Sequence, residues 1–399
     1  MNSQDDLQDY GTPLEAAERA ELRRGYEERL ARTKPRTDAV FAFEPMERPV
    51  ASVTDAVAWI FGHAPETVPE TFFTDPAAAL AAQERWYLNH LRTVDDDWVP
   101  YLMPWFGTVV AASAFGCRVE FQPGQDPAAD PTYYPVQGPD DIRRLRIPDP
   151  ERDGLMPTVL EFQRHFLENG NLPVAITDHQ GPLTTANQLM GYDKLIYLMM
   201  DDPKAMHQLM DVVTDGLITW VQAQKDLIGE GPGYCIANQS MYTGENIGVW
   251  LSDDDAVLID ADLYREFVVP YNSRILSAFG GGIIHYCGNA SHHVESFLAT
   301  DGLKGINTFS LYHFDALAEL HERVKDRLVL IVGDHTPLDY RPYLDRLAAI
   351  IEPRGVIFLS LYSPILGLLP GGRYESVPDG RDDSPREFHE YLVEAFARQ

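Results

Sequence analysis

The sequence GGGIIHYCGNASHHVESFLATDGLKGINTF, residues 280–309, has the pattern of a strand, a helix and a second strand. Glycines precede the first strand, and His285 and Cys287 stand at its end. Because side chains two positions apart in a strand share a face, we expect an imidazole and a thiol side by side. Residues 291–300 then predict a helix, and residues 305–309 predict the next strand. Strand ends of this kind are where α/β folds place their chemistry.

The same alternation of strand and helix extends through most of the chain. Short apolar runs recur at residues 172–177, 233–237, 282–286, 303–307, 328–332 and 355–359, with earlier candidates at 98–101 and 118–121. Helix-length segments lie between them at residues 203–227, 262–279 and 340–351. Because short apolar strands that alternate with helices indicate a parallel sheet, we predict an α/β protein with a closed (β/α)8 barrel of the TIM type. An open doubly wound sheet is the alternative, although no Gly-x-Gly-x-x-Gly motif follows any strand.

The first residues of the chain differ in character from the rest. Residues 1–45 are polar and contain AAERAELRRGYEERLARTK, in which Glu and Arg repeat on a helix-forming background. We predict a helical arm over residues 1–45 and a barrel domain over residues 46–399, with the barrel proper starting near residue 95. A surface helix and an oligomer contact are the two interpretations of the arm.

Composition excludes some classes of partner. The 399 residues carry a formal net charge of −29, which argues against nucleic acid or an anionic membrane as the main partner. No apolar run approaches the roughly 20 residues of a membrane span. The three cysteines form no Cys-x-x-Cys motif, and no secretory leader precedes them, so we expect a reducing, cytoplasmic setting. Cys117 and Cys235 lie in apolar surroundings and are predicted to be structural thiols, with no disulfide in the chain.

Polar side chains gather at the ends of the apolar strands. These residues are Asp178, His179, Asn238, His285, Cys287, Asn307, Asp334, His335, Ser360 and Tyr362. In a barrel the strand ends converge on one mouth, so we expect these side chains to lie near one another. Asp178, His179, Asn238 and Tyr362 are the candidate catalytic residues. Each of these polar residues could instead cap the helix that follows it.

His285 and Cys287 are also candidate metal ligands. Imidazole nitrogen and thiolate sulfur are preferred ligands of zinc, and a catalytic zinc has about three protein ligands and one open position. His335 ends the neighbouring predicted strand and is the expected third ligand; His179 and Glu245 are alternatives. The structural interpretation is that Cys287 is a small buried hydrophobe.

Several stretches resemble the uroporphyrinogen decarboxylase superfamily, and together they cover roughly residues 95–397. They are DDDWVPYLMPWFGTVVAASAFGCRVEF, TYYPVQGPDDIRRLRIPDP, PVAITDHQGPLTTANQLMGYDKLIYLMMDDP, LSDDDAVLIDADLYREFVVPYNSRI and HYCGNASHHVESFLATDGLKGINTF. The resemblance implies a barrel of the triosephosphate isomerase type and, in many members, a homodimer.

Within that superfamily the chain is most similar to the cobalamin-dependent methyltransferases. Their zinc signature is His-x-Cys followed much later by a second Cys, and His285 and Cys287 match its first half. The later Cys is missing, because Leu361 and Tyr362 stand about where it would fall. The resemblance implies methyl transfer, with zinc assistance, between a corrinoid (cobalamin), carried on a partner corrinoid protein, and a small-molecule acceptor or donor.

Two other functions remain open from the sequence. The first is a decarboxylase-like lyase on a small carboxylic acid, in which Asp178, His179 and His335 act as acid and base groups. Decarboxylation of uroporphyrinogen itself is disfavoured, because the Arg-rich RQAGR motif that grips its carboxylates is absent. The second is a barrel that serves as a binding or assembly subunit. Bound metal would distinguish the methyltransferase from the lyase, and the absence of any potential ligands at the barrel mouth would favour the binding subunit.

Overall fold

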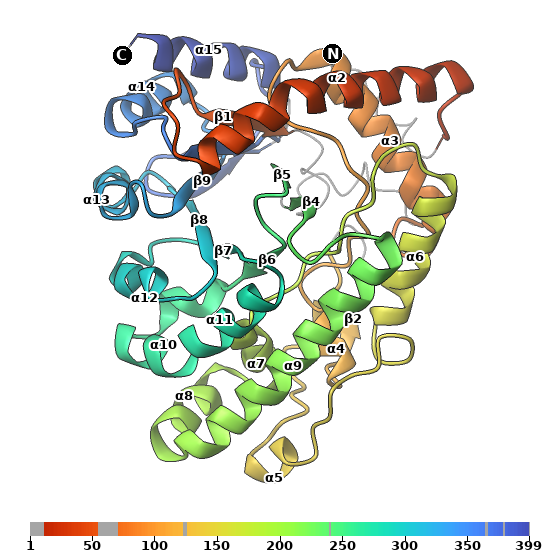
Figure 1. Ribbon diagram of the computed structural model, residues 1–399, viewed down its shortest axis with the longest axis vertical. Coiled ribbons are helices and arrows are strands. Elements are labelled where there is room, and N and C mark those ends of the chain that lie inside the picture. Colours follow the sequence, from red (N-terminus) through yellow and green to blue (C-terminus); the bar gives the residue numbers. More distant parts are fainter. Residues whose placement is uncertain are drawn as a thin grey trace.

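A six-stranded parallel sheet organises the protein (Figure 1). The computed structural model describes residues 12–54, 71–122, 126–238, 241–363, 366–377 and 380–398. The strand order is β1-β10-β9-β8-β7-β6, with bounds Val50–Thr54 (β1), Val249–Ser252 (β6), Gly282–Tyr286 (β7), Leu303–Phe309 (β8), Val329–His335 (β9) and Val356–Leu361 (β10). These strands are nearly continuous apolar runs, as expected for parallel strands that are buried on both faces.

Irregular segments continue the sheet beyond both of its edges. Gln180 forms a parallel bridge with Ser252 beside β6, and Leu102 forms another with Val174. On the opposite edge, the backbone N–H of Asp97 donates to the carbonyl of Ala51 in β1 at 2.8 Å. The α/β prediction is therefore confirmed. Six strands form regular ladders, whereas the runs predicted near residues 98–101 and 172–177 make only single backbone contacts. Those two runs lie among prolines, which cannot donate to a ladder.

Two predicted strands lie outside this sheet. The run at residues 118–121 contributes only β2 (Val119–Glu120), which pairs antiparallel with β3 (Ala128–Ala129). The run at residues 233–237 contributes β4 (Cys235–Asn238), which pairs antiparallel with β5 (Met241–Gly244). Their prediction as barrel strands was wrong. The alternation of apolar residues predicts extended backbone, but it does not specify the partner strand.

Helices cover the outside of the sheet (Figure 1). Their bounds are Ala16–Phe41 (α2), Pro76–Thr93 (α3), Val110–Ala114 (α4), Pro139–Ile142 (α5), Met156–Asn169 (α6), Pro182–Met190 (α7), Tyr192–Asp201 (α8), Pro203–Ile228 (α9), Ala261–Phe267 (α10), Val269–Ala278 (α11), Val294–Leu298 (α12), Phe314–Val324 (α13), Tyr340–Ile350 (α14) and Pro385–Ala397 (α15). Short 3-10 helices lie at Asp254–Leu258 (η3) and Ser291–His293 (η4), and a hairpin is formed by Leu366–Leu369 (β11) and Arg373–Ser376 (β12). None of these helices is long and apolar enough to cross a membrane.

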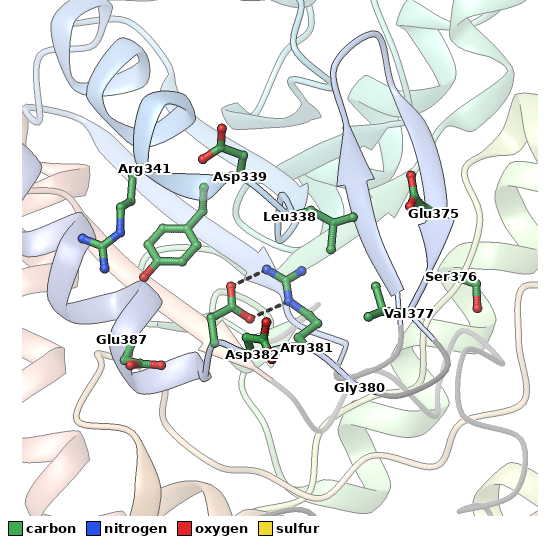
Figure 2. A pocket seen from close by; sticks show the side chains of 12 residues that line it. Leu338, Asp339, Arg341, Glu375, Ser376, Val377, Gly380, Arg381, Asp382 and Glu387 are labelled. Atoms are coloured by element: carbon green, nitrogen blue, oxygen red, sulfur yellow. Dashed lines mark hydrogen bonds and ion pairs between the residues drawn. The ribbon is translucent and has the colours of Figure 1, made fainter.

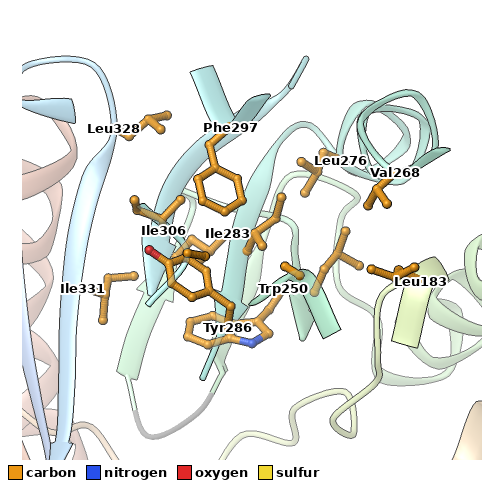
Figure 3. Close-up of a cluster of buried hydrophobic side chains, with 14 of the residues drawn as sticks. Leu183, Trp250, Val268, Leu276, Ile283, Tyr286, Phe297, Ile306, Leu328 and Ile331 are labelled. Atoms are coloured by element: carbon orange, nitrogen blue, oxygen red, sulfur yellow. The ribbon is translucent and has the colours of Figure 1, made fainter. Parts of the chain in front are cut away.

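The core between sheet and helices is apolar and closely packed (Figure 3). Ile283, Ile306 and Ile331 come from three adjacent strands and are fully buried. Phe297 of α12 and Leu276 of α11 lie over them. Each such side chain removes apolar surface from water, which stabilises the fold by about 1.5–3 kcal/mol per large residue. This packing fixes the strands whose ends carry the polar residues.

The predicted N-terminal helix is α2, and it packs against the barrel. The Arg29 guanidinium is buried, pairs with the carboxylate of Asp96 and donates to the carbonyl of Val94 at 2.8 Å. The hydroxyl of Thr33 donates to the carbonyl of Asp97 at 3.0 Å. These contacts join α2 to the segment that runs beside β1. The helix is therefore part of the packed protein, and the domain boundary near residue 45 remains a prediction.

Candidate metal centre

The imidazole of His285 is held at the end of β7 by its neighbours. Strand pairing places His285 opposite Asn307 of β8, and the imidazole Nδ1 lies against the side-chain oxygen of Asn307. The other amide atom of Asn307, Nδ2, donates to the carbonyl of Ile331 at 3.0 Å, which orients its oxygen towards the ring. Nδ1–H is then the donor, and Nε2 is the ring atom that a metal would bind in exchange for its proton.

Aromatic side chains fix the plane of the same ring. Trp250 stacks on His285 with ring centroids 6.0 Å apart and an angle of 19° between the planes. Phe309 meets the imidazole edge-on at 5.5 Å. Trp250 is fully buried, so the imidazole has little freedom to rotate away from its position. Rigid support of this kind favours a ligand that is already oriented before the metal arrives.

The Nε2 atom of His285 faces a thiol and a carboxylate. It lies 3.4 Å from the Sγ atom of Cys287 and 3.4 Å from Oδ1 of Asp254. Asp254 is the first residue of η3, just after β6, and its Oδ1 also accepts the backbone N–H of Cys287 at 3.2 Å. Within the described ranges, these three residues are the group whose ligand atoms gather within 4.8 Å of one another.

These three residues fit zinc. A nitrogen, a sulfur and a carboxylate oxygen are the ligand types that zinc takes in catalytic sites, and three of them leave one position open. A tetrahedral zinc with ordinary bond lengths places its nitrogen and sulfur ligands about 3.5 Å apart, close to the observed separation of Nε2 and Sγ. The chain thus supplies a compact ligand set in which Nε2 of the imidazole is already directed at the other two ligand atoms.

The third member of the group is Asp254, where the sequence predicted His335. The ring of His335 packs against Tyr374 at 4.9 Å and against Phe309 at 6.1 Å. His335 is not among the residues whose ligand atoms come together. Asp254 lies in the run Asp253–Asp255, which resembles an ordinary helix-capping sequence. No local signal separated it from its neighbours, because the fold alone brings the end of β6 beside β7.

Burial and the close pairing perturb all three groups. Burial by itself lowers the pKa of His285, but the neighbouring Asp254 and Cys287 outweigh it and raise that pKa well above its ordinary value. Burial raises the pKa of Asp254, but the His285 contact outweighs it and leaves that pKa lowered. Burial raises the pKa of Cys287, and the imidazole offsets this only in part. The carboxylate–imidazolium pair therefore stabilises the charged forms in the absence of metal.

Asp178 lies next to this group. Its Oδ1 accepts the hydroxyl of Ser252 at 3.3 Å, and Ser252 is paired with His285 in the β6–β7 ladder. Burial raises the pKa of Asp178 to about 6, while the charge of His285 lowers it and that of Asp254 raises it. Asp178 is therefore a buried carboxyl group that titrates near neutral pH beside the candidate ligands.

His179 points elsewhere. Its Nδ1 lies 3.3 Å from the carbonyl of Thr177, and burial lowers the pKa of its imidazole to about 4. Neutral imidazole at working pH suits a structural role better than proton transfer. Asn238 belongs to β4, and its side chain lies outside the described residues.

The side chain of Tyr362 is buried away from the candidate ligands. Its hydroxyl donates to the carbonyl of Asp383 at 2.7 Å, and the Arg381 guanidinium lies over its ring at 5.1 Å. Arg381 also forms a forked pair with Asp383 (Figure 2). This pair borders a cavity of about 580 Å³ whose lining includes none of the candidate ligands. Tyr362 is thus tied to that pair and is not gathered with the candidate ligands.

All three cysteines lie in the described part of the chain and are free thiols. Cys117 and Cys235 are buried, and Cys287 is exposed. Burial raises the pKa of Cys117 to about 12, so it is inert as a nucleophile at neutral pH. The predicted absence of disulfides is confirmed.

Known proteins resemble this chain in sequence and fold. The family model described as "Uroporphyrinogen decarboxylase (URO-D)" matches residues 101–340. A methylated-thiol–coenzyme M methyltransferase of Methanosarcina mazei is 28% identical over 197 residues, 47% of each protein. A uroporphyrinogen decarboxylase of Geobacillus kaustophilus is 30% identical over 194 residues, 46% of this chain and 50% of the relative. The chain thus spans about half the length of these curated relatives. A solved methyltransferase from Methanosarcina mazei has a similar fold, with a TM-score of 0.63, 17% identity, and coverage of 91% of this chain and 97% of that one.

Proposed function

We propose that this chain, which belongs to the uroporphyrinogen decarboxylase family, is a zinc-assisted methyltransferase that acts between a corrinoid and a small molecule. The observation that carries the proposal is the convergence of His285 Nε2, Cys287 Sγ and Asp254 Oδ1 at the end of β7. A decarboxylase acting by acid–base chemistry alone has no need of a thiol in such a group. The printed names of two relatives, both methyltransferases, support the same reaction class.

Zinc bound here would act as a Lewis acid that lowers the pKa of a bound acceptor or polarises a methylated donor. The remaining work belongs to the chain itself. Asn307 holds the proton of His285 on Nδ1 and so keeps Nε2 free. Asp254 binds the backbone N–H of Cys287 and fixes the turn that presents the thiol.

Asp178 is the proposed base at this site. Both of its oxygens accept hydrogen bonds, from Ser252 at 3.3 Å and from Gln180 at 3.4 Å. With a pKa of about 6, it is mostly ionised at neutral pH and can accept a proton from a bound substrate. We propose that the corrinoid is carried by a partner corrinoid protein. A homodimer and a cytoplasmic location remain predictions.

The second candidate is a decarboxylase-like lyase that uses Asp178 without metal. The observation that favours it is the buried Asp178 carboxyl, together with the uroporphyrinogen decarboxylases among the relatives. His179 gives it less support, because its ring faces the Thr177 carbonyl and its pKa is lowered to about 4.

Metal analysis after zinc supplementation tests the proposal. We expect about one zinc per chain in the wild type and loss of zinc in Cys287→Ser and Asp254→Asn. His335→Gln is the control, since His335 packs against Tyr374, and it should keep its zinc. Zinc-loaded protein is then incubated with methylcobalamin and 2-mercaptoethanol, and separately with cob(I)alamin and trimethylamine, while the corrinoid absorbance is followed. A wild-type protein that takes up no added zinc would contradict the methyltransferase and leave the lyase.

A further inference from the structure

Two further carboxyl groups, those of Asp178 and Asp126, lie outside the ligand group but interact with each other. Asp178 is 3% exposed and is joined through Ser252 to the strand position opposite His285. Asp126 lies close enough to Asp178 for the two charges to interact, and it sits against the indole of Trp105. The Oδ1 atom of Asp126 is buried and accepts no hydrogen bond. Asp126 Oδ1 is therefore a carboxyl oxygen without a donor, whereas both oxygens of Asp178 accept hydrogen bonds.

An uncharged acceptor at the same place also lacks a donor. Gln180 is 1% exposed, and its Nε2 donates to Oδ2 of Asp178 at 3.4 Å. Its Oε1, on the same amide group, is buried without a hydrogen-bond partner. A buried acceptor without a donor is unfavourable unless a bound molecule supplies one. The unpartnered Oε1 thus points independently to a ligand that carries N–H or O–H groups.

Among the described residues, His285 is the cationic group next to Asp254, and lysine and arginine contribute no ion pair to these carboxylates. In the described ranges, no lysine or arginine forms an ion pair with Asp126, Asp178 or Asp254. The residues outside those ranges contain no lysine or arginine at all. A zinc ion bound by Asp254 and the Cys287 thiolate would have its two positive charges balanced by them. Asp126 and Asp178 would still lack a counter-charge.

Aromatic rings surround the same space. Trp105 adjoins Asp126, Trp250 and Phe309 contact His285, and Tyr374 lies near enough to Cys287 for their charges to interact. Aromatic faces together with carboxylates attract alkylammonium groups, because the ring quadrupole favours a cation. The same surroundings disfavour anions, because the described lysines and arginines form no ion pair with these carboxylates.

We propose that the small-molecule substrate of this site carries a protonated, methylated amine, which Asp126, Asp178 and Gln180 Oε1 recognise. The inference rests on the proposed function, which places the substrate beside the candidate metal centre. The new claim is that this substrate is positively charged. The N–H group of the ammonium donates to one of the two unpartnered acceptors, and its positive charge offsets part of the negative charge of the two carboxylates. A substrate whose reacting end is a carboxylate or sulfonate is excluded by the same charges.

Three ligands of similar size and different charge test the proposal. Zinc-loaded wild-type protein at pH 7.5 is titrated with trimethylammonium, tert-butanol and pivalate by calorimetry. We expect trimethylammonium to bind about tenfold more tightly than tert-butanol, and pivalate to bind least. Asp178→Asn and Asp126→Asn should weaken trimethylammonium binding about tenfold each and leave tert-butanol unchanged. Asp315→Asn is the matched control, because Asp315 is fully exposed on α13, and it should change nothing.

Two results would overturn the inference. One is pivalate that binds as tightly as trimethylammonium to the wild type, a comparison that needs no variant to fold. The other is an Asp178→Asn or Asp126→Asn variant that weakens all three ligands equally, which indicates general disruption of the site. Zinc content is measured on every sample. A protein without zinc that still prefers the cation refutes the proposed function alone, whereas a zinc-loaded protein that prefers the anion refutes this inference alone.

Discussion

Two groups of aspartates lie at opposite edges of the sheet and have opposite electrostatic surroundings. At the β1 side, Asp96 pairs with Arg29 and lies 3.2 Å from His90, and Asp97 pairs with Arg48 at 2.6 Å. At the β6–β7 side, Asp178 accepts a hydrogen bond from Ser252 and Asp254 pairs with His285, and neither forms an ion pair with a described arginine or lysine. The first group is a structural clamp between α2 and the barrel. The second is available for a metal and a substrate.

Hydrogen bonding separates the two groups further. Asp96 accepts the backbone N–H of Val53 at 2.7 Å, and Asp97 accepts that of Ala51 at 3.0 Å, so both carboxylates are engaged by β1 as well as by arginine. Burial by itself raises the pKa of Asp96, but His90 and Arg29 outweigh it and lower that pKa far below its ordinary value. Burial raises the pKa of Asp178 to about 6, because the nearby His285 and the hydrogen bond from Ser252 offset it only in part. A buried carboxylate that is paired with an arginine thus has a structural role, whereas one without such a pair can take part in binding or proton transfer.

The largest effect is expected when the clamp between α2 and the barrel is broken. Arg29→Ala leaves Asp96 buried without its main counter-charge, which should lower the free energy of unfolding by about 3–5 kcal/mol. Chemical denaturation measures the loss, and zinc affinity should not change. Arg92→Ala removes an exposed pair with Glu21 and should cost no more than about 1 kcal/mol. Equal losses in the two variants would remove the distinction between the clamp and an ordinary surface pair.

The converse change is made at the metal centre. Asp254→Asn removes a negative ligand and should weaken zinc binding about 100-fold or more, because an amide oxygen is a poorer zinc ligand than a carboxylate. Competition with a chelator dye measures the affinity. Without metal, the free energy of unfolding of the variant should lie within about 1 kcal/mol of the wild-type value, since Asp254 is the partly exposed first residue of η3. Destabilisation as large as that of Arg29→Ala would place Asp254 with the clamp instead.

The pH dependence of stability should differ in sign between the two groups. The native pKa of Asp178 is raised to about 6, above its unfolded value, so the metal-free native state binds more protons between about pH 4 and 6. This contribution is present at about pH 4 and is lost as the pH rises through 6. The native pKa of Asp96 is lowered, so its contribution is present above about pH 4 and is lost on further acidification.

Denaturation of metal-free protein from pH 3 to 8 measures both contributions. Asp178→Asn should flatten the decline in stability between about pH 4 and 6 by up to about 2 kcal/mol relative to wild type. The loss of stability below about pH 4 should remain, because Asp96 is unchanged. An identical dependence of stability on pH in the variant and the wild type would show that the native pKa of Asp178 is not raised.

The smallest expected effect concerns orientation of the ligand. Asn307→Ala removes the acceptor of the His285 Nδ1–H, which should weaken zinc binding about tenfold. The spectrum of the cobalt-substituted protein reports whether the ligand geometry has changed. Asn246→Ala is a control on a different loop, where the amide donates to Asp38 at 2.9 Å, and it should leave zinc binding unchanged. Unchanged affinity in Asn307→Ala would mean that Trp250 and Phe309 suffice to hold the ring.

Much of the fold was predictable because its signals are local. Four of the predicted apolar runs are strands of the sheet and two more adjoin its edges, since a short apolar run between helices has few other stable arrangements in water. The runs at residues 118–121 and 233–237 look the same in sequence but form antiparallel hairpins. The strands with which these two runs pair are determined by tertiary packing, and the local sequence pattern does not specify the partner strand.

For this protein, the sequence by itself determined the α/β class, the helix α2 and the pairing of His285 with Cys287. Each depends on spacing along one segment, and backbone geometry converts such spacing directly into position. Only the tertiary structure decided that Asp254 joins them in place of His335, that Tyr362 belongs to the Arg381–Asp383 pair, and that Asp178 lacks the arginine that Asp96 has. Those facts depend on which strand lies beside which, and that arrangement is fixed by burial of the whole core.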